Sequence, residues 1–345
     1  MRVEKKTLFI QLLTIILITS IISITGCITN TQDPQESDNI NKTQELQQTR
    51  QAMGTIVTIK IIGHKASSQC ALDKAFDEIS TIEDTTSPYK QDSEISRLNK
   101  EGYINGASPD LLFLIERSIN YGTLSNGAFD ITIQPVLDLW KTKISAGEYP
   151  DKEEINKTLT LVNYSNITIN NDTIAFNMHG MAVTLGGIAK GYAVDRAVSV
   201  LKEEGYLSGL VNAGGDGMYF GTGLDGSNWR VGLVNPDNKS ESIVILNISD
   251  MAVATSGNYE RYFNESARLS HISDPRDGYS CQSLISATVI ATSAMEADTL
   301  ATTIFVLGPV DGMELIERIE TVECLLITSD RNIIRSSGFS SYETV

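Results

Sequence analysis

The sequence predicts an α+β fold with a largely antiparallel sheet and flanking helices. Of its 345 residues, 41% are hydrophobic and 20% charged, which is enough apolar material for a substantial core. Helix-like and strand-like segments follow each other without a regular β-α-β alternation. The short β-rich runs have Gly, Asn, Asp and Pro at their ends. An antiparallel sheet is therefore favoured over a doubly wound parallel one.

The elements can be placed from periodicity. Within Gly54–Ile62, one face would carry Thr55, Val57, Ile59 and Ile61 and the other Ile56, Thr58 and Lys60, which predicts a strand. Helices are predicted at Ala66–Glu83, Pro109–Leu124, Ile188–Glu204, Ala294–Val306 and Val310–Ile319. Further β-rich runs are Leu210–Phe220, Trp229–Val234, Ile243–Ile248, Ala287–Ala291 and Glu323–Thr328.

The N-terminus is typical of an exported protein. Arg2, Lys5 and Lys6 precede an apolar run, Leu8–Ile24, which ends at Gly26 and Cys27. Small residues before a cysteine at this point resemble a lipoprotein cleavage site, so residues 1–26 are predicted to be a signal peptide and Cys27 to be lipidated. An uncleaved single-span anchor is the alternative. Both interpretations place the body on the extracytoplasmic face of the cell membrane.

The domain organisation follows from composition. Residues 27–49 are polar and predict a flexible, lipid-anchored tether. No second linker follows, so residues 50–345 form one catalytic body. The net charge of −16 makes nucleic acid an unfavourable partner. Cys70, Cys281 and Cys324 have no C-x-x-C spacing and indicate neither a zinc site nor a disulfide framework.

A late helix carries the sharpest local motif. Ser293 and Glu296 have capping-box spacing at its start, and Gly308 comes just past its end. Asp298 and Thr302 are four residues apart and share one face, which we expect near the helix surface. Two hard oxygen donors suit Mg²⁺. Such a pair alone is more often a solvated face or a local hydrogen bond.

A glycine-rich turn, LGGIAKGYAVD at 185–195, leads into an earlier helix with Lys190 in its first turn. Exposed N–H groups at such a turn can face phosphate oxygens. The motif is neither a P-loop nor a Rossmann fingerprint, and a plain strand-to-helix turn with a surface lysine would explain it as well.

Three further stretches combine turn residues with polar side chains: NAGGDG (212–217), NGAFDIT (126–132) and HISDPRDG (271–278). By themselves they are explained by a hairpin turn, a helix-ending glycine with a following strand, and a type I turn closed by glycine. A lone histidine such as His271 is weak support for catalysis.

Taken together and in order, these segments resemble the ApbE family, the FAD:protein FMN transferases. The matching motifs are AMGTIVTI (52–59), SPYKQDSEISRLN (87–99), NGAFDITIQPV (126–136), TLGGIAKGYAVD (184–195), NAGGDGMYFG (212–221), AVATSGNYERYF (252–263), HISDPRDG (271–278) and TSAMEADTLATTIFVLG (292–308). They cover nearly all of the body, and the fold is expected to be ApbE-like.

The resemblance also implies site residues. Mg²⁺ would be held by Asp298, Thr302 and the carbonyl of Gly187. FAD would be contacted at Met53, Tyr89, Ala128, Phe129, Asp130, Thr184, Lys190, His271 and Ile272. His271 would help to deprotonate the acceptor hydroxyl, so His271 and Asp298 are the catalytic candidates. Thr184 stands where the family usually has an acidic residue, which weakens the expected FAD contact there.

The implied activity is Mg²⁺-dependent transfer of FMN from FAD to a Thr or Ser hydroxyl of a target flavoprotein, with release of AMP. Family acceptors include subunits of membrane electron-transfer complexes, which suits a membrane-tethered enzyme. Two alternatives stay open on the sequence. With water as acceptor the same site would be an FAD pyrophosphatase, and without chemistry the chain would be a flavin-binding lipoprotein.

Overall fold

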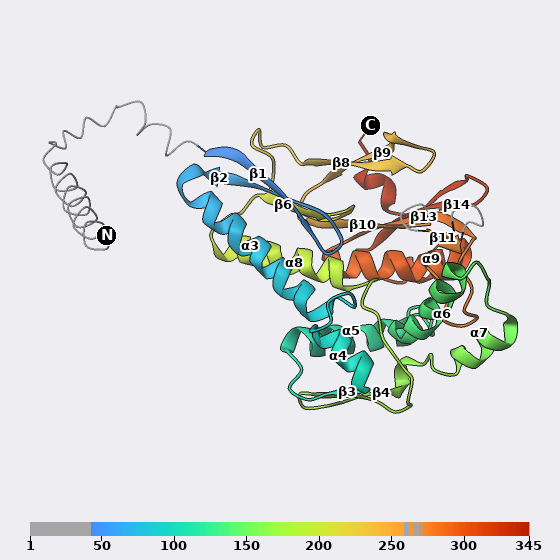
Figure 1. Cartoon of the computed structure of the whole chain (residues 1–345). Helices are drawn as coiled ribbons and strands as arrows, with labels where there is room; N and C mark the ends of the chain where they lie inside the picture. The colour runs from blue at the N-terminus through green and yellow to red at the C-terminus, as the bar shows by residue number, and fades with distance from the viewer. Residues whose placement is uncertain (1–42, 259–261, 265–268, 271, 345) are drawn as a thin grey trace, which may run out of the picture. The chain divides into compact units, whose positions relative to one another are not determined.

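The computed structural model describes residues 43–344, apart from 259–261, 265–268 and 271. The predicted signal peptide, Cys27 and His271 lie outside the described residues. Thr43–Val345 form one compact unit. Its framework is an eight-stranded antiparallel sheet in the order β1-β2-β6-β7-β10-β13-β14-β15 (Figure 1). The strands are β1 (Thr43–Ala52), β2 (Thr55–His64), β6 (Gly209–Ala213), β7 (Asp216–Phe220), β10 (Met251–Gly257), β13 (Leu284–Ala291), β14 (Glu323–Thr328) and β15 (Ile333–Arg335).

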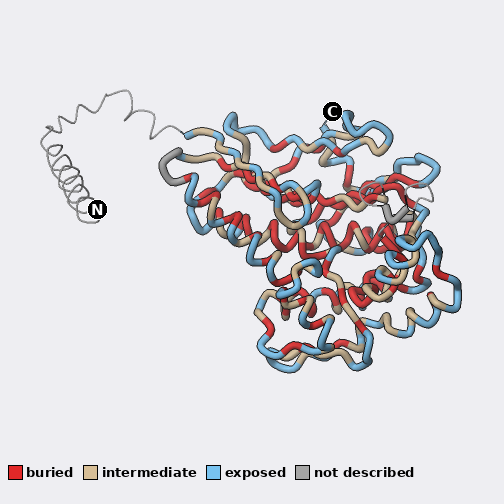
Figure 2. Tube along the Cα trace, viewed as in Figure 1, coloured by how far each residue is buried: buried red, intermediate tan, exposed pale blue. Residues whose placement is uncertain are grey.

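Three long helices pack along one face of this sheet: α3 (Lys65–Thr86), α8 (Ala189–Glu203) and α9 (Ala294–Ile316). The core lies between them and the sheet, where the side chains of Val57, Ile59 and Ile61 are fully buried. Figure 2 shows the buried residues concentrated in α8, α9 and the central strands. A hairpin of β8 (Trp229–Asn235) and β9 (Asn238–Ile248) covers part of the other face with a second apolar cluster.

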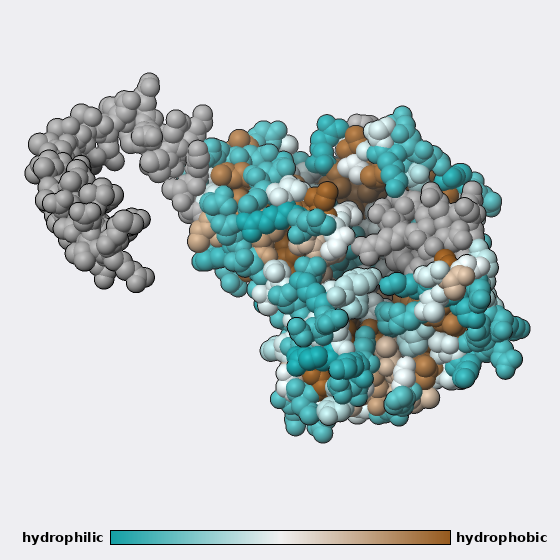
Figure 3. All heavy atoms as spheres, in the orientation of Figure 1, coloured by the Kyte–Doolittle hydropathy of each residue, from teal (hydrophilic) through white to brown (hydrophobic). Residues whose placement is uncertain are grey.

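A second group of elements completes the unit. It contains α4 (Glu94–Glu101), α5 (Pro109–Leu124), α6 (Gln134–Ser145), α7 (Lys152–Leu159) and a three-stranded sheet of β3 (Tyr103–Ile104), β5 (Thr173–Phe176) and β4 (Ile167–Asn170). In Figure 1 these elements lie below α8 and α9. A short pair of β11 (Tyr262–Asn264) and β12 (Leu269–Ser270) follows β10. The surface in Figure 3 is mostly hydrophilic, as expected of an acidic chain.

The predicted α+β class and antiparallel sheet are confirmed, and several elements match closely. The predicted hairpin at NAGGDG joins β6 to β7 through Gly214 and Gly215, which both have positive φ. The predicted break at Gly308 is present inside α9, with φ 81° and ψ −176°. Ser293 caps α9 by accepting the Glu296 N–H at 3.2 Å.

The structure differs from two sequence predictions. The tether ends earlier than residue 49, because β1 begins at Thr43 and pairs with β2 along its whole length. Its residues are polar because β1 is an edge strand with one face exposed, so the alternation of apolar residues that reveals a strand is missing. The strand that the simple explanation of NGAFDIT places after Gly127 is instead a 3₁₀ turn, Ile131–Ile133, followed by α6 with Pro135 in its first turn.

Candidate active site

The glycine-rich turn brings three predicted site residues together. A Cβ placed on Gly187 would lie 3.1 Å from the Thr302 hydroxyl oxygen and 3.2 Å from the Phe129 ring. The turn before α8 therefore lies against the middle of α9 and against Ala128–Asp130, the AFD segment. A side chain at position 187 would crowd Thr302 and Phe129. A Cβ placed on the neighbouring Gly186 would contact only Thr184 Oγ1, at 3.5 Å, within the same turn.

Asp298 is buried between α9 and α8 and does not lie at the helix surface. Its side chain is buried, and its Oδ2 accepts the backbone N–H of Gly191 at 2.9 Å. Burial raises the pKa of Asp298, while the charge of Lys190 acts in the opposite direction. The expectation of a surface carboxylate was wrong because α9 is a core helix with most of its residues buried, and Asp298 lies on the side that contacts α8.

Thr302 lies one turn after Asp298 on the same helix face, as predicted. Its hydroxyl is 3.1 Å from that of Ser256 on β10. Sequence reasoning gave Ser256 no role, although it belongs to the matching segment AVATSGNYERYF. One carboxylate, two hydroxyls and a nearby main-chain turn make an oxygen-only donor set, which is the type that Mg²⁺ prefers.

The donor set also fits Mg²⁺ better than a transition metal. Among the described residues there is no group of three or more His, Cys, Asp or Glu side chains that could hold a metal ion. A single buried carboxylate with neutral oxygen donors leaves positions for water and substrate phosphate, which is the usual coordination of Mg²⁺. The residues present therefore fit the implied ion.

Lys190 belongs to the first turn of α8 and forms an ion pair with Asp216 of β7. The Asp216 side chain is 2% exposed and that of Lys190 is 26% exposed. Asp216 Oδ1 also accepts the Thr255 N–H at 3.2 Å. This pair places a cation next to Asp298. No local sequence pattern indicates that Asp216 is buried.

The AFD segment is folded inward. Ala128 and Phe129 are buried, and so is Asp130. Asp130 accepts the Thr132 N–H at 2.8 Å with Oδ1 and the Tyr164 N–H at 2.9 Å with Oδ2. Burial raises the pKa of Asp130 in spite of these bonds. Both oxygens are thus engaged within the chain, where they fix the turn that presents Phe129.

Met53 and Tyr89 lie on projecting turns. Met53 is at the tip of the β1–β2 hairpin with φ 53°. This hairpin is held against the β6–β7 turn by a hydrogen bond from the Gly214 N–H to the Ile56 carbonyl at 3.1 Å. Tyr89 is 80% exposed.

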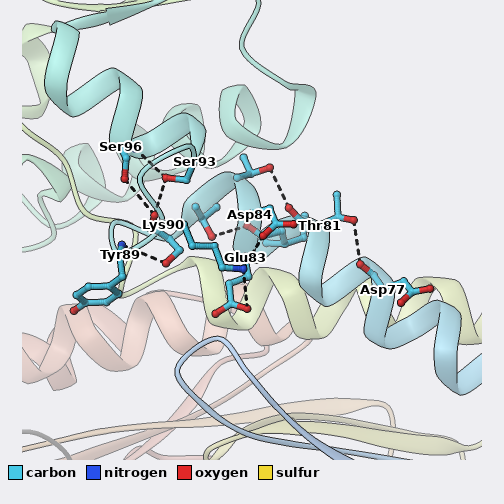
Figure 4. A network of polar contacts seen from close by, with 12 residues as sticks. Asp77, Thr81, Glu83, Asp84, Tyr89, Lys90, Ser93 and Ser96 are labelled. Atoms are coloured by element: carbon cyan, nitrogen blue, oxygen red, sulfur yellow. Dashed lines mark hydrogen bonds and ion pairs between the residues drawn. The ribbon is translucent and has the colours of Figure 1, made fainter.

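Local hydrogen bonds hold the segment around Tyr89. The Tyr89 N–H is 3.3 Å from the Ser87 hydroxyl, and the Lys90 ammonium binds Asp84 at 2.6 Å. Figure 4 shows this network, with the Tyr89 ring directed away from the Lys90–Asp84 pair. The backbone is therefore fixed while the ring remains available for stacking on a planar ligand.

The two other predicted flavin-binding positions are main-chain anchors. The Thr184 N–H donates to the Ile131 carbonyl at 2.8 Å, and the Thr184 hydroxyl accepts the Gly186 N–H at 3.3 Å. Ile272 is buried, and its carbonyl accepts the Cys281 N–H at 3.0 Å. Thr184 therefore shapes the glycine-rich turn with its hydroxyl, at the position where the family usually has an acidic residue.

A cavity of about 530 Å³ lies between the β8–β9 hairpin and the sheet. It is lined by Lys60, Asn212, Tyr219, Arg230, Thr255 and Thr288, among others, and includes no site residue predicted from the sequence. The metal-type donors and the phosphate-facing turn are on the helix side of the sheet. We therefore place the candidate site between the start of α8 and the N-terminal half of α9 and not in this cavity.

The fold is that of a flavin transferase of the ApbE type. The model of the ApbE family matches residues 53–326. A FAD:protein FMN transferase of Vibrio cholerae is 31% identical over 302 residues, which cover 84% of this chain and 88% of that protein.

Solved structures agree with this match. The ApbE flavin transferase of Vibrio cholerae superposes with a TM-score of 0.76 at 29% identity, covering 87% of this chain and all of that one. The ApbE protein of Thermotoga maritima gives a TM-score of 0.82 at 28% identity, covering 88% of this chain and all of that one. This chain belongs to the ApbE family.

Proposed function

We propose that this chain is a Mg²⁺-dependent FAD:protein FMN transferase, which moves FMN from FAD to a Thr or Ser hydroxyl of a target protein and releases AMP. Membership of the ApbE family supports the transferase activity. The observation that carries the Mg²⁺ dependence is that Gly187 lies against Thr302, while Asp298, one turn earlier on the same face of α9, accepts the N–H of Gly191. These residues form an oxygen-only site next to a glycine turn that can face phosphate.

Asp298 would supply the anionic ligand, Thr302 its hydroxyl and Gly187 its carbonyl. A bound Mg²⁺ would neutralise charge on the FAD pyrophosphate and on the departing AMP. Asp298 is suited to this because its burial makes a negative charge unfavourable without a cation. Lys190 is held by Asp216, and its ammonium group would contact phosphate as a hydrogen-bond donor more than as an added net charge.

The remaining residues would bind and orient the flavin. Phe129 is presented by the turn that Asp130 fixes, and Tyr89 offers an exposed ring. Met53 at the β1–β2 tip adds an apolar contact. Orientation matters because in-line transfer of a phosphoryl group requires the acceptor oxygen opposite the leaving group.

The acceptor hydroxyl is a poor nucleophile while it is protonated. We assign its deprotonation to His271 on the family resemblance of the motif HISDPRDG, since His271 lies outside the described residues. A neutral imidazole near the hydroxyl can remove the proton as the oxygen attacks phosphorus.

The cellular setting is also part of the proposal. The N-terminal sequence supports cleavage before Cys27 and lipid attachment there, which would place the enzyme on the extracytoplasmic face of the cell membrane. Subunits of membrane electron-transfer complexes would then be within reach as acceptors. Mass analysis of membrane-extracted protein should show a lipid-modified Cys27 as its first residue, and an intact Met1 would contradict this.

The function is tested with the purified body, FAD, Mg²⁺ and candidate acceptor proteins. Intact-mass spectrometry should show the acceptor heavier by one FMN less one water, with one AMP released for each FMN attached. Chelation of Mg²⁺ by EDTA should stop both. Release of AMP with free FMN, and with no acceptor modified, would identify an FAD pyrophosphatase. FAD binding without AMP release would identify a flavin-binding protein.

A further inference from the structure

An aspartate of α8 holds the first turn of α9. Asp195 Oδ1 accepts the Ala294 N–H at 2.8 Å, and its Oδ2 accepts the Met295 N–H at 2.9 Å. Helix N-termini leave their first N–H groups without intrahelical partners, and a carboxylate there is also favoured by the helix dipole. This contact crosses between two helices that are about 100 residues apart in the chain.

A second contact joins the same helices one turn away. The Gly191 N–H donates to Asp298 Oδ2 at 2.9 Å, and a Cβ on Gly191 would lie 2.2 Å from the Ala294 carbonyl oxygen. Gly191 precedes Asp195 by one helical turn, as Ala294 precedes Asp298. Two fixed points therefore determine both the rotation of α9 and its distance from α8.

Helix α9 already has an N-cap, so Asp195 does more than cap it. Ser293 already serves as N-cap residue, with its hydroxyl accepting the Glu296 N–H at 3.2 Å. Asp195 contributes what a local cap cannot, namely a link from α9 to the helix that carries Lys190 and the glycine turn. Glu296, in the same first turn, carries a similar charge but makes no such link in the described part of the chain.

We propose that Asp195 is a positioning residue of the divalent-cation site: by holding the start of α9 against α8 it keeps Asp298 and Thr302 facing Gly187. The inference rests on the Mg²⁺ site of the proposed function. Mg²⁺ requires near-octahedral geometry with short metal–oxygen distances, so a small rotation of α9 would separate its ligands. Asp195 itself touches neither substrate nor metal.

The test compares two variants of Asp195 with two matched controls. Asp195→Asn keeps the shape but turns an N–H donor toward one of the two helix N–H groups, and Asp195→Glu keeps the charge but moves the carboxylate. Ser293→Ala removes a cap bond of the same helix without touching α8. Glu296→Gln removes a nearby negative charge without touching the link.

The readout is direct binding of Mn²⁺, used as a probe for Mg²⁺, followed by the loss of the free-ion EPR signal. Both Asp195 variants should bind Mn²⁺ about 10-fold or more weakly than the wild type, the range found when residues supporting metal ligands are changed. Both controls should bind within about 2-fold of the wild type, since they leave the ligand positions unchanged. FAD affinity measured in EDTA should stay unchanged in all four.

Each result decides a different point. If the wild type binds Mn²⁺ and both Asp195 variants bind it equally well, the positioning role is overturned while the metal site stands. If the controls weaken binding as much as the Asp195 variants, a general effect of helix stability or charge replaces the positioning role. If the wild type binds no Mn²⁺, the metal site itself is overturned. Should Asp195→Asn fail to fold, Asp195→Glu carries the test.

Discussion

The carboxylate of Asp298 accepts a hydrogen bond from the backbone N–H of Gly191 at 2.9 Å, across 107 residues of sequence. This bond connects the proposed metal ligand directly to the glycine-rich segment that precedes and begins α8. It also orients the carboxylate, since one oxygen is held by the N–H and the other remains for a cation. Two motifs that are weak signals separately therefore form one site.

Asp298→Asn separates the charge of this residue from its shape. Transfer should fall by about 100-fold or more, because several kcal/mol of charge stabilisation in the transition state depend on the metal. Burial raises the pKa of Asp298, so its ionised form costs folding free energy at neutral pH when no metal is bound. The variant should therefore unfold in EDTA at the same temperature as the wild type or higher. Transfer at the wild-type rate without added Mg²⁺ would refute the metal assignment.

Gly187→Ala and Gly186→Ala form a matched pair in the glycine turn. The new methyl at 187 would lie 3.1 Å from the Thr302 hydroxyl oxygen, whereas at 186 it would meet only Thr184 Oγ1 at 3.5 Å. Displacing Thr302 should raise the Mg²⁺ concentration for half-maximal transfer by about 10-fold, as changes beside metal ligands do. The Gly186 variant should resemble the wild type. Equal effects of the two changes in a Mg²⁺ titration would argue against Thr302 as a ligand.

Lys190→Met tests the ion pair with Asp216. Because the Asp216 side chain is 2% exposed, removing its partner leaves a buried charge unpaired. We expect the free energy of unfolding to drop by about 3 kcal/mol, the lower end for a broken buried pair because Lys190 is partly exposed. The double variant Lys190→Met, Asp216→Asn should recover much of the lost free energy of unfolding, because it no longer has an unpaired buried charge. Lys74→Met, which breaks the exposed pair with Glu204, is the control and should change stability little in urea unfolding. No recovery in the double variant would mean that the loss comes from packing.

His271→Ala tests the proposed base. If the neutral ring takes the acceptor proton, the wild-type rate should rise with pH through an apparent pKa of about 6.5 and then level off. The variant should lose both turnover and this rise while FAD affinity changes little, because the lost interaction belongs to the transition state. Much weaker FAD binding with an unchanged pH–rate profile would instead assign His271 to flavin binding.

The sequence predicted the elements that carry regular local signals. Pro109 and Gly308 mark helix boundaries because they restrict or free the backbone, and the structure places α5 and the break in α9 there. The pairing of Asp298 with Thr302 on one helix face follows from helical spacing alone. That Gly187 lies against them could be expected only from the family resemblance, since nothing local links the two motifs.

The missed features depend on tertiary contacts. Nothing in the local sequence distinguishes Asp195 and Asp216 from surface carboxylates. The packing of α8 against β7 and α9 buries Asp216 and leaves Asp195 partly buried. Burial raises the pKa of Asp195 to about 6, a property that no periodicity reveals. Strand β1 was missed for the opposite reason, because its backbone pairing with β2 defines it while its side chains are polar.

The most direct measurement of the central claim is a crystal structure of the protein soaked with Mn²⁺ and FAD, with anomalous diffraction used to locate the ion. The account predicts an anomalous peak bonded to the Asp298 carboxylate, the Thr302 hydroxyl and the Gly187 carbonyl, with flavin phosphate oxygens completing its shell. A peak at another group of residues, with FAD bound and these three oxygens free of metal, would contradict it.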